Sequence, residues 1–274
     1  MEFFDNKSIW DNIENSHIPT DNLESISTFI DCYSFLIYEF TISFNFEKEN
    51  FLSGIKLNSF ILSAKMTLDS IILCTGKLRL SDAFELVRKY RDSVCFFAYT
   101  ILTNKIDLGD KNIDIEKWSK NNRHDYGVKK FVKLFQTKEL KDFIDRYKIR
   151  KKYNDYNKLL NNYVHLNGIK YMNNHQYCCH EGYSFYKEII DKEVDNIYSI
   201  VTFFTLLFVS MIALVYPRSI RSTDYDDCIY LGVIPEDDSL YWCPPFLSDF
   251  FVRHEKIIGE DLINYLCKKT GMKL

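Results

Sequence analysis

The residues best suited to chemistry stand in and beside the stretch LNNYVHLNG, residues 160–168. On a helix, Lys158, Asn161, Asn162 and His165 fall within roughly a 100° arc, because positions i, i+3, i+4 and i+7 share a face. A neutral imidazole is the usual general base near pH 7, and two amides beside it can bind a phosphate or a ribose. The pattern indicates a proton-transfer or hydrogen-bonding site. The alternative is a water-facing stripe whose histidine caps the helix before the Asn-Gly pair.

A second polar group precedes it in ELVRKYRDSVCFFAYTIL, residues 85–102. Glu85, Arg88 and Asp92 lie on one helical face, but from Val94 onward the helix is apolar all round and must be buried. An unpaired charge that enters a buried segment is costly. The three side chains therefore either satisfy one another or face a second polar helix, for which the stripe described above is the candidate.

Six residues of these two segments carry a family resemblance: Arg88, Arg91 and Asp92 in the earlier helix, and Asn162, Tyr163 and His165 in the later one. In this pattern, over about residues 20–215, the chain resembles the HEPN superfamily of prokaryotic helical bundles. The resemblance implies a four- or five-helix bundle, often a homodimer, of the kind common among toxin-antitoxin and antiviral (phage) defence proteins. Many members are metal-independent endoribonucleases with an Arg-x4-6-His motif.

The resemblance assigns a role to each polar residue. It implies that His165 is the general acid or base for attack by the ribose 2′-hydroxyl, and that Arg88 or Arg91 stabilises the charge that develops on the phosphate. Asn162 would position the substrate, and Asp92 would orient an arginine. The reaction would require neither a metal ion nor another cofactor.

The chain departs from the family motif at its arginine. No arginine stands five to seven residues before any of the six histidines, and the nearest analogue is Lys158, six intervening residues before His165. Lysine is a point charge, whereas the guanidinium is a bidentate fork, so the two are not equivalent. Arg88 or Arg91 would supply the guanidinium from the neighbouring helix.

Two other function classes remain open. The first is a catalytically silent HEPN-like module that dimerises through the same polar residues of the two helices. It would bind nucleic acid, an antitoxin or another defence protein. The second is an effector anchored in a membrane by a single span.

The charge distribution bears on the partner. The chain holds 35 Lys and Arg against 38 Asp and Glu, which gives a net charge of −3. Residues 105–170 nevertheless hold 17 Lys and Arg against 9 acids. This local excess of basic residues predicts a surface for a polyanion such as RNA. The alternative is a set of solvated helix faces.

The cysteines favour a reducing compartment. None of the eight stands in a CxxC pair, several lie in apolar runs, and the acidic opening MEFFDNKSIW has no apolar signal core. We therefore expect a cytoplasmic protein. His175, Cys178, Cys179 and His180 include ligand types that zinc prefers, but they lack the second pair of a structural site, so no metal is expected.

The elements that position these residues are expected to be nearly all helical. Only nine glycines and five prolines interrupt 274 residues, and apolar residues recur at three- and four-residue spacing. The expected fold is all-α: an HEPN-like helical bundle over residues 1–217, with a C-terminal appendage over 218–274 that packs its aromatic residues on the bundle. The expected helices span about residues 21–46, 55–75, 81–104, 114–121, 128–135, 138–148, 152–166, 183–216, 247–257 and 259–270.

One run could change this assignment. IYSIVTFFTLLFVSMIALVY, residues 197–216, contains no charge and is long enough to cross a bilayer. Because the helix begins upstream with charged, amphipathic turns, we expect it to be a central core helix that is buried on all sides.

Overall fold

The computed structural model describes residues 18–43, 51–103, 105–106, 108, 128–164 and 183–274. Its α-helices are α2 (Asp21–Ser43), α3 (Phe51–Gly76), α4 (Leu80–Leu102), α6 (Val128–Lys133), α7 (Lys141–Arg146), α8 (Ile149–Val164), α10 (Tyr183–Val215), α11 (Asp224–Tyr230), α12 (Pro245–His254) and α13 (Leu262–Thr270). Within these residues, extended backbone pairs only at a single bridge between Trp242 and Lys273. The expected all-α helical bundle is confirmed.

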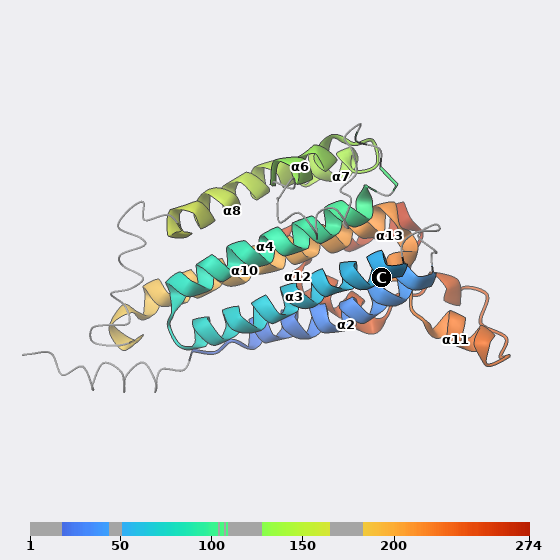
Figure 1. Ribbon diagram of the computed structural model, residues 1–274, viewed down its shortest axis with the longest axis horizontal. Coiled ribbons are helices and arrows are strands. Elements are labelled where there is room, and N and C mark those ends of the chain that lie inside the picture. The colour runs from blue at the N-terminus through green and yellow to red at the C-terminus, as the bar shows by residue number, and fades with distance from the viewer. Residues whose placement is uncertain (1–17, 44–50, 104, 107, 109–127, 165–182) are drawn as a thin grey trace, which may run out of the picture.

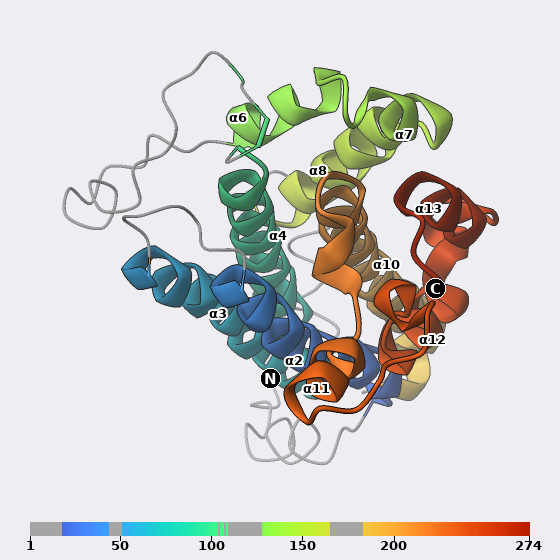
Figure 2. The same ribbon diagram turned by 90° about the vertical axis from the view of Figure 1, so that its right-hand side faces the viewer.

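Helix α4 is the centre of the bundle. Four long helices, α2, α3, α4 and α10, run together along the long axis (Figure 1), and α4 packs against both α3 and α10. Helices α6, α7 and α8 form an outer layer beyond α4 and α10 (Figures 1 and 2), in which α8 contacts α4. The polar residues of α4 that the sequence singles out therefore have α8 as a direct neighbour.

Two helices in the described part of the chain are long and apolar enough to cross a membrane. In α10, within Lys187–Val215, an apolar window of 18 residues has 83% of its residues buried in the protein, as the expected core helix requires. In α3 the segment Ser59–Gly76 is only 39% buried, and Leu62, Met66 and Leu73 are exposed on its outward face. Length and composition alone select both helices, and the burial of α10 agrees with a core role.

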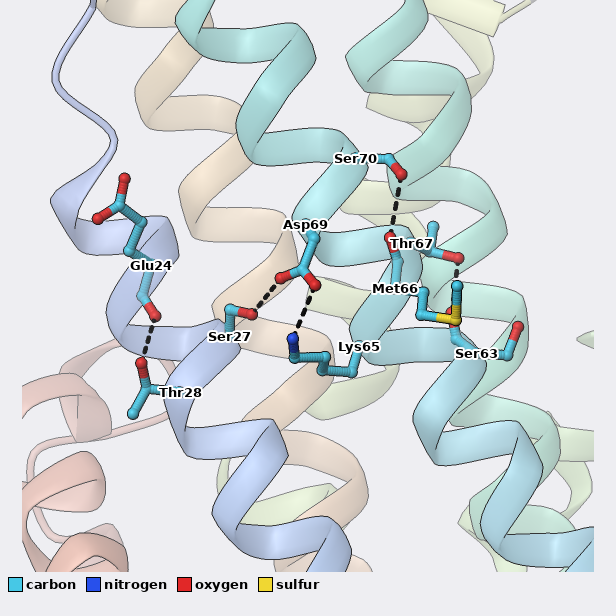
Figure 3. A network of polar contacts seen from close by, with 9 residues as sticks. All are labelled: Glu24, Ser27, Thr28, Ser63, Lys65, Met66, Thr67, Asp69 and Ser70. Atoms are coloured by element: carbon cyan, nitrogen blue, oxygen red, sulfur yellow. Dashed lines mark hydrogen bonds and ion pairs between the residues drawn. The ribbon is translucent and has the colours of Figure 1, made fainter.

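A polar contact fixes the register of α2 on α3. Ser27 Oγ donates a hydrogen bond of 2.6 Å to Asp69 Oδ1, and Lys65 Nζ, one turn before Asp69, lies 2.8 Å from Asp69 Oδ2 (Figure 3). Because Ser27 belongs to α2 and Asp69 to α3, a shift of either helix by one residue would break this hydrogen bond. The apolar faces on either side of it are thereby held in one alignment.

The outer layer is more broken than its apolar pattern predicts. One helix was expected over residues 138–148, but α7 spans only Lys141–Arg146. Lys148 has a φ of 51°, in the left-handed region, which ends α7 and lets α8 begin in a new direction at Ile149. After α6, the chain continues as a 3₁₀ turn over Leu134–Gln136.

The C-terminal region packs on the bundle through aromatic rings. Phe250 of α12 stacks on Phe29 of α2, with ring centroids 3.7 Å apart and planes 13° from parallel. His254, at the end of α12, lies beside Tyr198 of α10, and α13 packs on the same helix. The region and the bundle therefore share one continuous hydrophobic core.

Gly259 is expected to tolerate no side chain. A Cβ at this position would lie 2.5 Å from Cδ1 of Tyr147, whose ring already contacts the rings of Phe143 and Tyr265. We expect Gly259→Ala to lower the free energy of unfolding by about 1–2 kcal/mol, because the crowded ring must move. Urea unfolding measures this, and Gly232→Ala, where the added carbon has open space but φ is +70°, separates steric overlap from backbone strain. Unchanged stability in Gly259→Ala would contradict the prediction.

Candidate functional site at the seam between α4 and α8

An aromatic stripe positions α8 over α4 and α10. The stripe follows helical spacing, because Tyr153, Tyr156 and Tyr163 recur at three- and seven-residue intervals. Tyr163 stacks on Phe84 of α4, with centroids 3.8 Å apart and planes 3° from parallel. Tyr153 and Tyr156 contact Phe204 and Phe203 of α10, at 5.7 Å and 4.9 Å between centroids. These rings fix which face of α8 meets the polar residues of α4.

Arg91 is the polar centre of this seam. Its Nε and NH2 donate to Asp92 Oδ1 at 2.9 Å and 2.7 Å, and its NH1 donates to Asn157 Oδ1 of α8 at 2.7 Å. The Arg91 side chain is 6% exposed, whereas that of Asp92 is 45% exposed. The guanidinium is therefore held from both helices and already satisfied, so it joins α4 to α8 and is not offered to a ligand.

Arg88 is the less enclosed arginine. It stands one turn before Arg91 on α4 and is partly exposed, and within the described residues it forms no ion pair. Phe84 meets Tyr163 and Arg91 meets Asn157, so α4 and α8 run antiparallel and Arg88 lies at the level between these two contacts. The Arg88 guanidinium is therefore partly open to solvent at the edge of the seam.

A buried carboxylate closes the far end of the seam. Tyr163 Oη donates a hydrogen bond to Glu193 Oε2 of α10, and Asn196 Nδ2 donates to the same oxygen at 3.2 Å. Glu193 is buried, and these two donors stabilise its carboxylate. Further along α10, Thr205 donates to the Val201 carbonyl, so the Tyr90 hydroxyl of α4 is the donor in its 2.6 Å contact with Thr205.

The predicted stripe of α8 does not meet Arg91. Asn162 and Lys158 are exposed, and Asn157 lies about 140° around the helix axis from Asn162, since five residues advance an α-helix by that angle. We expected the stripe of α8 that contains Asn162 to meet α4. Helix α8 does contact α4, but the residue that binds Arg91 is Asn157. His165 lies outside the described residues, one position beyond Val164 at the end of α8.

The buried thiol beside this cluster is not a nucleophile. Cys95 stands one turn after Arg91 and is buried among the core helices. Burial raises the pKa of the Cys95 thiol, although the nearby Arg91 lowers it. The protonated thiol therefore acts as a small apolar side chain.

No metal-binding group appears in the part of the chain that the structure describes, where no three His, Cys, Asp or Glu side chains gather in a way that could hold an ion. The sequence cluster that includes His175 and Cys178 falls outside these residues.

The outer layer carries the basic charge. Residues 128–164 hold eleven Lys and Arg against four Asp and Glu. Arg146 pairs with Asp261, and Asp142 pairs with Lys269. Asp261 and Lys269 both belong to the C-terminal region. Five exposed lysines of the layer form no ion pair with another described residue: Lys138, Lys141, Lys148, Lys151 and Lys158. Unpaired cations on one layer produce the positive field that attracts a polyanion.

On α8 the exposed cations and amides follow one line. Lys151 and Lys158 are seven residues apart and share a face, and Asn161 and Asn162 continue it toward the C-terminal end of the helix. All four side chains are exposed. The line thus leads along the helix from the cations to Asn162, three positions before His165 in the sequence.

Comparison with protein-family models, with curated proteins and with solved structures finds no match to this chain. The geometry of the seam and the charge of the outer layer are therefore the basis for assigning a function.

Proposed function

We propose that this protein is an RNA-directed effector of the HEPN type that binds RNA across the α6–α8 layer and cleaves it beside the C-terminal end of α8. The observation that carries the proposal is the line of exposed Lys151, Lys158 and Asn162 on α8. Phosphate contacts by lysine supply most of the affinity for a nucleic acid without sequence preference. The amides add hydrogen-bonding groups that can contact a base or a ribose.

The chemistry assigned to the site needs one base and one cation. His165 takes the proton of a ribose 2′-hydroxyl, the 2′-oxygen attacks the adjacent phosphorus, and the 5′-oxygen leaves and gains a proton. Arg88 stabilises the charge on the phosphate, because Arg91 is already held by Asp92 and Asn157. Asp92 acts by orienting Arg91, and Asn162 positions the substrate. The proposed reaction uses no metal ion.

The enclosure of Arg91 favours a second candidate function. A guanidinium held by two helices serves packing, and a catalytically silent HEPN-like module needs no more than that at its seam. In this version the basic layer binds RNA, and the seam holds α8 in place. The two candidates share the binding surface and differ only in cleavage.

The binding surface is tested by charge reversal. We expect Lys148→Glu, Lys151→Glu and Lys158→Glu together to weaken binding of a labelled single-stranded RNA at least about tenfold and to flatten its salt dependence by about two logarithmic units per decade. Lys89→Glu, Lys256→Glu and Lys268→Glu change the net charge equally at exposed lysines outside the layer and serve as the matched control. Equal losses in both variants would show general electrostatics and exclude the α6–α8 surface.

Cleavage is tested separately. Purified protein is incubated with labelled total RNA and tRNA in EDTA, beside His165→Ala, Arg88→Ala and Arg88→Lys. Fragments that disappear in His165→Ala and Arg88→Ala, with RNA binding retained, support the nuclease. Intact RNA in every lane with binding retained supports the silent module. Failure of the wild-type protein to bind RNA would exclude both.

A further inference from the structure

An arm projects from the body between α10 and α12. The chain leaves the bundle after Arg221 and returns at Trp242, and α11 within this arm contains no buried residue. In Figure 1 the arm stands at the right-hand edge of the molecule, beyond the ends of the long helices. The tip of the arm is the segment IYLGVI, residues 229–234. Five large apolar side chains of the tip are 54% to 93% exposed: Ile229, Tyr230, Leu231, Val233 and Ile234.

The arm is held at its base. Ser222 N donates to the Trp242 carbonyl at 2.8 Å, and Arg221 pairs with Asp226. At the tip, Gly232 has a φ of +70° and turns the chain, and Val233 N donates to the Cys228 carbonyl at 2.8 Å. The backbone is thus folded so that the apolar side chains of the tip face water. An exposed apolar patch on a folded element marks an interaction site.

Acidic residues flank the apolar tip on both sides. Asp224 and Asp227 precede it, Glu236 and Asp237 follow it, and all four are exposed. Asp226 and Asp238 are paired at the base, whereas these four form no ion pair with another described residue. A complementary surface must therefore offer an apolar hollow with cations at its rim.

The chain itself presents such a hollow at the junction of α7 and α8. The hollow has a volume of about 440 Å³. Tyr147 and Ile258, which are 6% and 1% exposed, form its floor. Lys148 and Lys152 line it as well, and Lys151 is exposed one turn along α8. Arg146 and Asp261 also line the hollow, and their charges cancel because they form an ion pair. The charges of Lys148 and Lys152 are left, so the hollow is positively charged.

The arm and the hollow cannot meet within one molecule. Figures 1 and 2 show α11 on the side of the bundle opposite to α6, α7 and α8. Two different complementary surfaces on opposite sides of one chain give heterologous contacts, which build rings or open chains and not a two-fold dimer. We propose that the acidic, apolar-tipped arm of one copy docks into the basic hollow at the α7–α8 junction of a second copy, so that the protein assembles head to tail.

This inference does not depend on RNA binding, and its test uses protein alone. In sedimentation velocity, the wild-type weight-average mass should rise past two copies with concentration. It should fall when salt increases from about 50 mM to about 500 mM, because the rim charges are screened. Tyr230→Asp with Ile234→Asp should remain monomeric with unchanged helicity. Met66→Asp with Leu73→Asp removes apolar side chains of α3 that are 69% and 67% exposed, and this variant should assemble as the wild type does.

A charge swap identifies the two surfaces. One variant reverses the arm, with Asp224→Lys, Asp227→Lys, Glu236→Lys and Asp237→Lys, and the other reverses the hollow, with Lys148→Glu and Lys151→Glu. Each alone should be monomeric, since its arm and hollow then carry the same sign. An equimolar mixture should assemble again, because each arm now meets a hollow of opposite sign. A mixture that stays monomeric, a wild-type protein that stays monomeric, or a dimer that ignores the tip substitutions would overturn the proposal.

Discussion

Replacing Asp92 by alanine is expected to lower the free energy of unfolding by about 3 kcal/mol, which is more than removing its partner Arg91 should cost. Asp92 Oδ1 accepts two hydrogen bonds from Arg91, whose side chain is only 6% exposed. Without Asp92, the buried guanidinium keeps one partner, Asn157. A buried charge that loses its counter-ion retains its desolvation penalty, whereas Arg91→Met removes the charge and keeps most of the volume.

A thermodynamic cycle measures this order. Urea unfolding of Asp92→Ala, Arg91→Met and the double variant should give losses of about 3, about 1–2 and about 1–2 kcal/mol. The acid Glu85 stands two turns earlier on the same helix and is exposed, so Glu85→Ala is the matched control and should change stability by less than about 0.5 kcal/mol. If Arg91→Met cost more than Asp92→Ala, the guanidinium would be packing apolar groups and would not need the carboxylate.

The second large effect is a loss of stability in mild acid through His254. This side chain is buried, its Nδ1 lies 2.8 Å from the Tyr198 hydroxyl, and its Nε2 has no hydrogen-bond partner among the described residues. Burial, together with the neighbouring charge of Arg253, lowers the pKa of His254 from 6.5 to about 4. The folded protein therefore holds the imidazole neutral where the unfolded chain protonates it.

The sign of the pH dependence follows from that difference. Above about pH 6.5 neither state binds the proton and the contribution to stability is complete; as the pH falls toward 4, the unfolded state binds it first and stability is lost. Between about pH 7 and about pH 5 the loss from His254 should reach about 2 kcal/mol. In His254→Gln, which does not titrate, unfolding free energies at these two pH values should differ by correspondingly less. Equal pH dependence in both proteins would assign the effect to the carboxylates.

The sequence predicts a helix well where one face of that helix, or its whole circumference, is buried in the core. The apolar run from Val94 onward identified the inner half of α4, and the charge-free run after Ile197 identified the core of α10. Both patterns depend on the spacing of apolar residues within one helix, which needs no knowledge of its neighbours. Helix ends were less predictable, since the left-handed conformation at Lys148 has no sequence signal comparable to a glycine.

The seam was predictable in its elements but not in its partners. Asn157 and Asn162 both lie in a helix with polar residues around most of its circumference, so composition does not reveal which asparagine faces α4. The large tyrosines decide it: Tyr153, Tyr156 and Tyr163 direct one face of α8 inward, and Asn157 lies among them. A search for the partner of Arg91 that started from the tyrosine spacing would have found it.

The arm departs most from what the sequence suggests. The aromatic residues after Pro217 were expected to pack on the bundle, and Phe250 and Phe251 of α12 do so. Tyr230 does not, and Ile234 beside it at the tip is exposed as well. The sequence does not indicate whether an apolar side chain packs within its own molecule or against another one. The expected packing on the bundle was therefore wrong for Tyr230 at the tip.

The contact between Tyr90 and Thr205 joins residues 115 positions apart, and it has a consequence for biosynthesis. The ribosome makes α4 early, but α10, which covers the inner face of α4, emerges only after the whole outer layer has been translated. During that interval the face of α4 that packs on α10 has no permanent cover, although α3 already covers another face. Long-range contacts of this kind slow the folding of a chain. The newly synthesised protein should therefore depend on a holding chaperone until residue 215 has left the exit tunnel, and truncation before α10 should yield aggregates and not a smaller stable bundle.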